Sequence, residues 1–224
     1  MTNMRKAGGI AAVVAAATYV FAMGLFATTM KPMADESIVF EQYMAFLSAH
    51  ETLVFAWHSS MYFVNGICLV VLVLALHERL RDGSPRLAKI ASAFGFIWVA
   101  LVFLSGLILN GGTSALLKLY DRAPAQAEAL KHALDAITSG IDSSDRLLGS
   151  LWVGLVSVAA LRTKDFAQAI NLFGLAIGAA GLVGTAVPGL AAVSYIFGLG
   201  AIVWWLALGY CMLRGQGAAA SAKE

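Results

Sequence analysis

The sequence predicts an all-α fold: a polytopic membrane helix bundle with six transmembrane helices, both termini cytoplasmic and two amphipathic helical connections on the outer side. Three observations predict it: six apolar stretches, a very apolar composition, and basic residues that alternate between the two sides of these stretches. A helix needs about 20 apolar residues to cross about 30 Å of hydrocarbon. The chain is expected to form one integral membrane domain with helices at 8–30, 52–76, 88–109, 143–162, 166–187 and 190–213.

The composition independently indicates a membrane protein. Of the 224 residues, 60% are hydrophobic and only 12% are charged, and the mean hydropathy is +0.79. A surface so poor in charge needs lipid to cover much of it. The net charge of +2 comes without a basic patch interleaved with aromatic residues, which excludes nucleic acid as a partner. Cys68 and Cys211 lie inside apolar stretches, and no spacing indicates a metal or redox motif.

The distribution of Lys and Arg predicts the orientation. Ten of the fifteen basic residues fall on one side of the stretches, namely Arg5, Lys6, Arg79, Arg81, Arg86, Lys89, Arg162, Lys164, Arg214 and Lys223. The other five, Lys31, Lys118, Arg122, Lys131 and Arg146, fall on the opposite side. Because basic residues are retained on the cytoplasmic side, the first group marks the inside.

The first stretch begins like a secretory signal peptide, because Arg5 and Lys6 precede an apolar run. That run is longer than the apolar region of a typical signal, and no convincing cleavage site precedes Lys31. We therefore expect an uncleaved first helix. The alternative, cleavage, would leave five spans and an outside N-terminus.

Three features concern the last helices. The uncharged run 147–161 is short, so the fourth helix is expected to extend outward through Arg146 and to place Asp142 and Asp145 near the headgroups or inside the bundle. Pro188 and Gly189 predict a tight hairpin between the fifth and sixth helices. A stripe of small residues on the fifth helix predicts the close approach of another helix: Gly174, Gly178, Gly181 and Gly184.

The outer connections, 31–51 and 110–142, are too long to be simple turns. Asn110, Gly111 and Gly112 predict a helix end, and Pro124 predicts the start of a separate helix. Each connection carries one apolar face suited to lying on a membrane surface. These faces comprise Phe40, Tyr43, Met44, Phe46 and Leu47 in the first, and Leu130, Leu134, Ile137 and Ile141 in the second.

Polar residues within the membrane concentrate on the second helix. His58, Tyr62 and Asn65 are spaced i, i+4 and i+7, with Glu51 seven residues earlier, so one helical face is predicted to carry all four. One interpretation is a structural network that satisfies the imidazole. The other is the wall of an outward-opening ligand site, with Asp142 and Asp145 from the fourth helix.

Specific chemistries find little support in the residue spacing. Haem held by two histidines is disfavoured, because His50, His58 and His77 belong to the same helix or its ends. A metal site would draw on Glu51, His58, Asp142 and Asp145, without any compact ligand motif. Ser59 and Ser60 lack an oriented base, so no catalytic residue is predicted. We predict no cofactor and no metal; bound lipid is compatible with the sequence.

The chain resembles a family of small bacterial integral membrane proteins of about six helices, classed as a domain of unknown function. The resemblance rests on the order of the helices, on the connection His77-Glu78-Arg79-Leu80-Arg81, on the glycine-bearing helix 87–110 and on the closing helix 199–214. It implies a multi-pass protein of the bacterial cytoplasmic (inner) membrane. It supplies no reaction and no catalytic residues.

Three classes of function remain open from the sequence. The first is an integral membrane protein that binds or transports a small hydrophobic or amphipathic molecule at an outward-facing site in the bundle. The second is an accessory or assembly subunit of a larger membrane complex, or a homo-oligomer, since no chemistry is evident. The third is a membrane-embedded metal or redox enzyme. Membrane lipid is an expected partner in every case.

Overall fold

The computed structural model describes residues 2–33, 35, 37–187 and 189–215, and these residues form helices and short connections without a strand. The α-helices are α1 (Thr2–Thr28), α2 (Phe40–Ala49), α3 (Glu51–His58), α4 (Asn65–Leu80), α5 (Pro85–Tyr120), α6 (Pro124–Thr163), α7 (Gln168–Ala186) and α8 (Ser194–Arg214). The π-helix η2 (Ser59–Val64) joins α3 to α4, and η1 (Lys31–Met33) and η3 (Ala191–Val193) are short 3-10 helices.

Within the described part of the chain, six helices are long and apolar enough to cross a membrane, which makes the protein a multi-pass, all-α membrane protein and confirms the predicted fold class. They are α1, the continuous segment α3–η2–α4, α5, α6, α7, and α8 with η3. Each packs against its neighbours in sequence, and α8 closes the ring by packing against α1. Polar side chains of the spanning helices are therefore expected to lie inside this ring.

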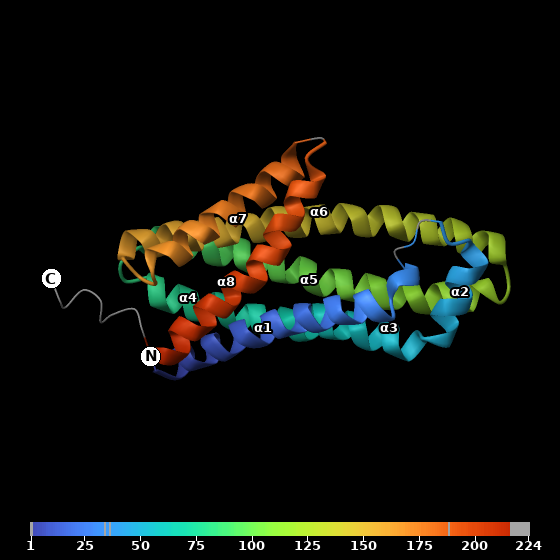
Figure 1. Cartoon of the computed structure of the whole chain (residues 1–224), viewed down its shortest axis with the longest axis horizontal. Coiled ribbons are helices and arrows are strands. Elements are labelled where there is room, and N and C mark those ends of the chain that lie inside the picture. The colour runs from blue at the N-terminus through green and yellow to red at the C-terminus, as the bar shows by residue number, and fades with distance from the viewer. Residues whose placement is uncertain (1, 34, 36, 188, 216–224) are drawn as a thin grey trace.

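The two ends of the bundle differ in what they carry (Figure 1). The start of α1, the end of α8 and the turns at 81–84 and 164–167 lie together at one end, called the inner end. The opposite, outer end carries α2 and the turn between α5 and α6. Both ends of the described chain thus lie on the same side, as the six-span prediction requires. Assigning the inner end to the cytoplasm stays a prediction.

Helices α5 and α6 are much longer than the sequence predicts. The predicted helix end at Asn110–Gly112 is wrong, because α5 continues to Tyr120. At 1.5 Å per residue its 36 residues extend about 54 Å, nearly twice the thickness of a hydrocarbon core. Gly112 is accommodated because α5 packs here against α6: a Cβ on Gly112 would lie 2.9 Å from Leu134, whereas a Cβ on Gly111 would meet no atom within 4 Å.

The sequence separates a helix in the outer connection, 110–142, from the fourth spanning helix, 143–162, whereas the structure shows no break between them. Residues Pro124–Thr163 form one unbroken helix of 40 residues. Pro124 does begin it, as predicted. Beyond it, the hydroxyls of Thr138, Ser143 and Ser144 donate to backbone carbonyls four residues earlier, so these polar residues are satisfied without leaving the helix.

Most apolar side chains of the outer segments pack on protein, which corrects the prediction that these faces lie on a membrane surface; Ile137 of α6, in contrast, is 51% exposed. Met44 and Leu47 of α2 are fully buried in a cluster with Met30, Val54 and Leu116. Leu130 and Leu134 of α6 pack against the same cluster. The outer end is therefore a small folded region built on the extensions of α5 and α6.

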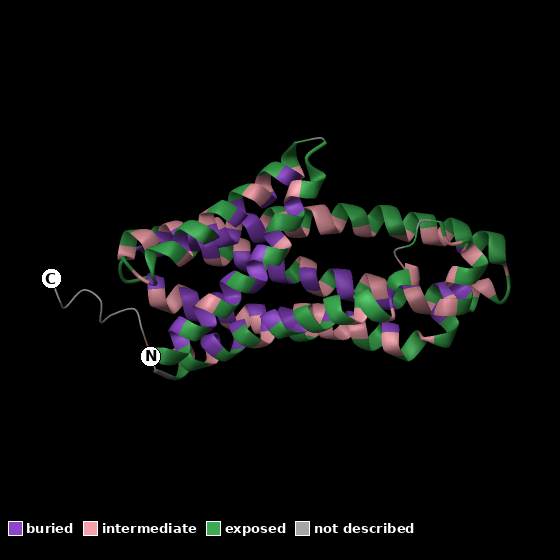
Figure 2. Cartoon of the chain, in the orientation of Figure 1, coloured by how far each residue is buried: buried purple, intermediate pink, exposed green. Residues whose placement is uncertain are grey.

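The main core lies in the half of the bundle where all six helices overlap, and the buried residues concentrate there in Figure 2. Its centre is aromatic: Trp98 packs against Trp152 and Trp205, and Trp152 against Trp204, with ring centroids 5.4 to 6.2 Å apart. The predicted glycine stripe of α7 is confirmed as a packing face. Side chains at Gly174 or Gly181 would overlap Ser157 or Ser150 of α6. Pro188 of the predicted hairpin lies outside the described residues.

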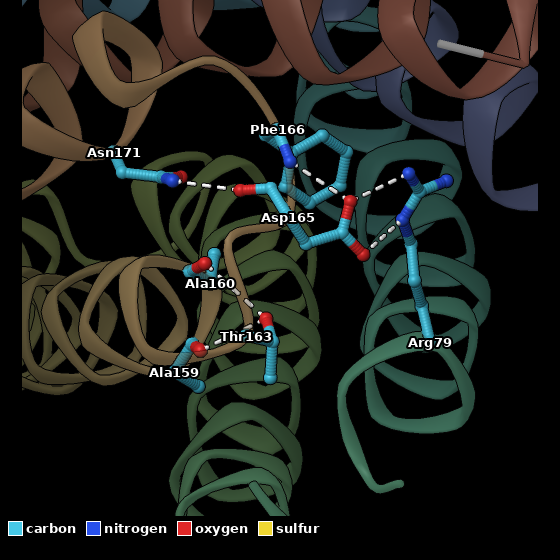
Figure 3. A network of polar contacts seen from close by, with 7 residues as sticks. All are labelled: Arg79, Ala159, Ala160, Thr163, Asp165, Phe166 and Asn171. Atoms are coloured by element: carbon cyan, nitrogen blue, oxygen red, sulfur yellow. Dashed lines mark hydrogen bonds and ion pairs between the residues drawn. The ribbon is translucent and has the colours of Figure 1, made fainter. Parts of the chain in front are cut away.

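A polar network fixes the inner turn between α6 and α7 (Figure 3). Arg79 of α4 donates two hydrogen bonds, 2.7 and 2.6 Å long, to the carboxylate of Asp165. Its guanidinium also lies 4.5 Å from the ring centroid of Phe166. Asn171 donates to the Asp165 carbonyl. Lys164 and Phe166 adopt positive φ angles, which are unfavourable for residues other than glycine. The contacts of Arg79 and Asn171 therefore hold a strained turn in place.

Candidate functional site at the outer end

The predicted polar stripe on the second helix is split by the π-helix. His58 precedes η2 and Asn65 follows it. The π-helix inserts about one extra residue into the helix, and one residue corresponds to about 100° of rotation around the helix axis. Residues on either side of it at the spacing i, i+4 and i+7 therefore no longer share one face. His58 faces α5 and Asn65 faces α1 as a result. The sequence carried no breaker that would have predicted this segment.

His58 is buried and bonded to Asn110 of α5. The Nδ1 atom of His58 lies 3.1 Å from Oδ1 of Asn110, and the Asn110 amide donates to Ser59 Oγ over 3.3 Å. A structural partner for His58 agrees with the first interpretation of the polar stripe, but this partner lies on another helix. Asn110 was missed because it was interpreted as a helix end; its position in an apolar run was the available signal.

Asn65 belongs to a separate, structural contact. Its amide donates 3.1 Å hydrogen bonds to the carbonyl of Ala15 and to the hydroxyl of Thr18 on α1. Thr18 in turn donates to Ala15. All three residues are buried in the interface between α1 and α4, so we assign Asn65 to packing.

Asp142 and Asp145 do not join His58 either. Trp98 Nε1 donates a 2.8 Å hydrogen bond to Asp145, which ties α5 to α6. The ring centroid of Tyr62 lies 6.2 Å from that of His58. Among the hydrogen bonds of the described residues, none joins Tyr62 to His58, Asp142 or Asp145.

A small cavity at the outer end does include His58. It has a volume of about 50 Å³ and lies beneath α2, between α5 and α6. Tyr43, Lys131 and Asp135 line it on its polar side, while Met33, Ile108, Leu109, Leu116 and Leu134 are among its apolar walls. Lys131 forms a 2.6 Å ion pair with Asp135 and lies 4.8 Å from the ring centroid of Tyr43. This pairing leaves little net charge in a space too small for most ligands.

Burial changes the titration of Tyr43 in this cavity. Removal of its phenol from water, assisted by the negative charge of Asp135, raises the pKa of Tyr43 to about 12. The phenol therefore stays neutral in the folded protein across the physiological range. As a neutral hydroxyl it can both donate and accept a hydrogen bond.

A larger cavity lies on the other side of α2, between α2, α3 and α5. Its volume is about 400 Å³. Three carboxylates line it, one from each helix region: Glu41 in the first turn of α2, Glu51 in the first turn of α3, and Asp121 directly after α5. Its other lining residues are Met44, Ala45, Ser48, Leu117 and Tyr120. Of the predicted site residues, Glu51 lines this cavity.

A third cavity, of about 420 Å³, lies between the outer end of α1 and the segment that leads to α2. Lys31 and Asp35 both line it, so it has no preference for one sign of charge. Hydrogen bonds from the hydroxyl and backbone N–H of Ser37 lower the pKa of the exposed Asp35. Of these three cavities, the one lined by Glu41, Glu51 and Asp121, hereafter the acidic cavity, has charged residues of one sign only.

The described residues contain no group of three or more His, Cys, Asp or Glu side chains placed to hold a metal ion. The three carboxylates of the acidic cavity thus surround a space of ligand size without converging on one point. Comparison of the chain with models of known families, with curated proteins and with solved structures finds no match. The resemblance drawn from the sequence stays a prediction, and the function must be argued from the geometry.

Proposed function

We propose that this protein binds a small amphipathic molecule with a cationic end at its outward-facing end, in the acidic cavity. The supporting observation is a single space of about 400 Å³ that three carboxylates line and no basic residue lines. Ligand cavities for small molecules measure roughly 300–1,000 Å³, so the size suits a ligand of modest dimensions. The cavity beside His58 is too small for that role.

Charge selects the class of ligand. Glu41, Glu51 and Asp121 come from three different segments, so a bound cation would be attracted from several directions. The field of like charges lining one concave surface raises the local concentration of counter-ions. Tyr120 offers an aromatic ring, onto which an organic cation can also pack.

Apolar residues of the same cavity accommodate the rest of the ligand. Met44 and Leu117 are apolar lining residues of this cavity, and Met side chains adapt to irregular shapes. The molecule proposed is therefore an organic amine or quaternary cation with a hydrocarbon portion. The bacterial inner membrane remains the proposed location, and the acidic cavity would open to the side opposite the cytoplasm.

A pair of probes with the same shape and opposite charge tests the proposal. Tetraphenylphosphonium and tetraphenylborate are titrated into the protein, held in nanodiscs of zwitterionic lipid, and empty nanodiscs give the background. We expect binding of the cation above background and none of the anion. Equal binding of the two ions would contradict the proposal.

Charge-neutralising variants locate the binding. Glu51→Gln and Asp121→Asn are each expected to weaken binding of the cation by roughly 2- to 5-fold, the range for partly exposed charge pairs. The matched control is Glu128→Gln, which removes an exposed carboxylate at the same end, outside the cavity lining. An equal loss in the control would show only a general effect of charge and would contradict binding in the cavity.

A second candidate is the accessory subunit of a larger membrane complex. The observation in its favour is the outer half of α6, where Ala129, Ala133, Ala136 and Gly140 are exposed and small enough for close helix contact. Co-purification of a stoichiometric partner in mild detergent, lost on Ala136→Leu, would favour this candidate over ligand binding.

A further inference from the structure

The inner end of the bundle is strongly basic, in contrast to the acidic cavity at the outer end. Among the described residues, seven basic side chains at this end are exposed, against one exposed carboxylate, that of Asp82. The seven are Lys6, Arg81, Arg86, Lys89, Arg162, Lys164 and Arg214. Arg79 and Asp165 are paired with each other and are mostly buried. The exposed surface at this end therefore carries an excess of positive charge.

One helix face at this end combines positive charge with an apolar stripe. Arg86 and Lys89 are exposed in the first turns of α5, and neither takes part in any ion pair of the described residues. Directly outward on the same face lie Ile90, Ile97 and Leu104, which are 47%, 52% and 42% exposed. Positions 86, 90, 97 and 104 fall within about 40° around the helix, since seven residues make almost two turns.

The order along this face matches the order of groups in a phospholipid. Basic side chains lie at the end of the spanning segment, where headgroups are found. The exposed Ile and Leu side chains lie further along the same spanning helix, whose apolar part acyl chains would surround. An anionic headgroup complements the two unpaired cations, whereas a zwitterionic headgroup brings its own positive charge.

We propose that the face formed by Arg86, Lys89, Ile90, Ile97 and Leu104 binds an anionic phospholipid. The basic pair holds the phosphate region, and an acyl chain lies along the apolar stripe. This site is independent of the cavity proposed above, because the two lie at opposite ends of the bundle. The pairing of basic residues with anionic lipid also predicts that the inner end faces the more anionic leaflet.

Native mass spectrometry of the whole protein tests the proposal. The protein is released from nanodiscs that contain equal amounts of phosphatidylglycerol and phosphatidylcholine, and the retained lipids are identified. We expect retention of phosphatidylglycerol over phosphatidylcholine. In Arg86→Gln/Lys89→Gln this preference should fall by roughly 25-fold, the loss for two basic residues at about 1 kcal/mol each.

A matched variant at the other end of the same helix is the control. Lys118→Gln/Arg122→Gln removes two exposed cations from the outer end and should retain the lipid preference. The charge-conserving Arg86→Lys/Lys89→Arg should retain it too. Equal retention of both lipids by the unaltered protein, an equal loss in the outer-end variant, or displacement of the lipid by inorganic phosphate would overturn the proposal.

Discussion

Close packing of α7 predicts a specific response to one added methyl group. In Gly181→Ala the new Cβ would overlap Ser150 Oγ of α6 and lie 2.9 Å from Cβ of Phe197 on α8. Contacts on both sides prevent a simple shift. Overpacking a buried site costs about 1–3 kcal/mol, whereas replacing glycine by alanine inside a helix gains at most about 1 kcal/mol. We expect a net loss of about 1–2 kcal/mol in the free energy of unfolding.

Unfolding of the variants in detergent, titrated with a denaturing detergent, measures this loss. Gly198→Ala on α8 is the control, because a Cβ there meets no atom within 4 Å; it should be as stable as the unaltered protein or more so. Ser150→Ala should partly rescue Gly181→Ala, since its buried Oγ has no hydrogen-bond partner to lose. A Gly181→Ala protein as stable as the Gly198→Ala protein would refute the reasoning.

Three further predictions concern polar contacts. Asp165→Asn leaves the mostly buried Arg79 without its charge partner and should cost about 3 kcal/mol in unfolding free energy, with little effect of added salt. Asn110→Leu leaves His58 buried and unpaired and should cost about 1–3 kcal/mol in unfolding free energy. Adding His58→Phe should restore part of this stability, whereas independent, additive losses would contradict the contact between the two residues. For Tyr43, whose pKa is raised to about 12, the unfolded chain loses the phenol proton at a lower pH than the folded protein, so stability should fall as the pH rises from about 10 to about 12. Tyr43→Phe should lessen that fall, and an unchanged pH profile would argue against burial of the phenol.

The six spanning helices could be predicted because hydropathy and length report directly on lipid exposure. The ends of these helices could not. Asn110-Gly111-Gly112 has the residue types of a helix end, yet packing of Gly112 against Leu134 keeps α5 helical to Tyr120. Local propensity at a glycine is worth about 1 kcal/mol, which a tertiary contact readily exceeds.

The site was predicted only in part, because its residues are brought together by two features without a local signal. The π-helix after His58 turned Asn65 away from His58, and no residue type in 59–64 marks such a turn. Glu41 and Asp121 join Glu51 only because α2 packs against the extension of α5. Glu51 lines a cavity, but its predicted role in ligand binding stays a prediction, and its neighbours in that cavity could be found only from the fold.

The sidedness of the bundle is the claim on which the outward-facing site depends, and labelling of single cysteines tests it most directly. In a background of Cys68→Ser and Cys211→Ala, Gln126→Cys probes the exposed start of α6 and Asp82→Cys the exposed turn at the inner end. We predict that a membrane-impermeant maleimide labels the first in intact cells, and the second only after the cells are permeabilised. Labelling of Asp82→Cys in intact cells, with Gln126→Cys protected, would place the acidic cavity in the cytoplasm and contradict the account.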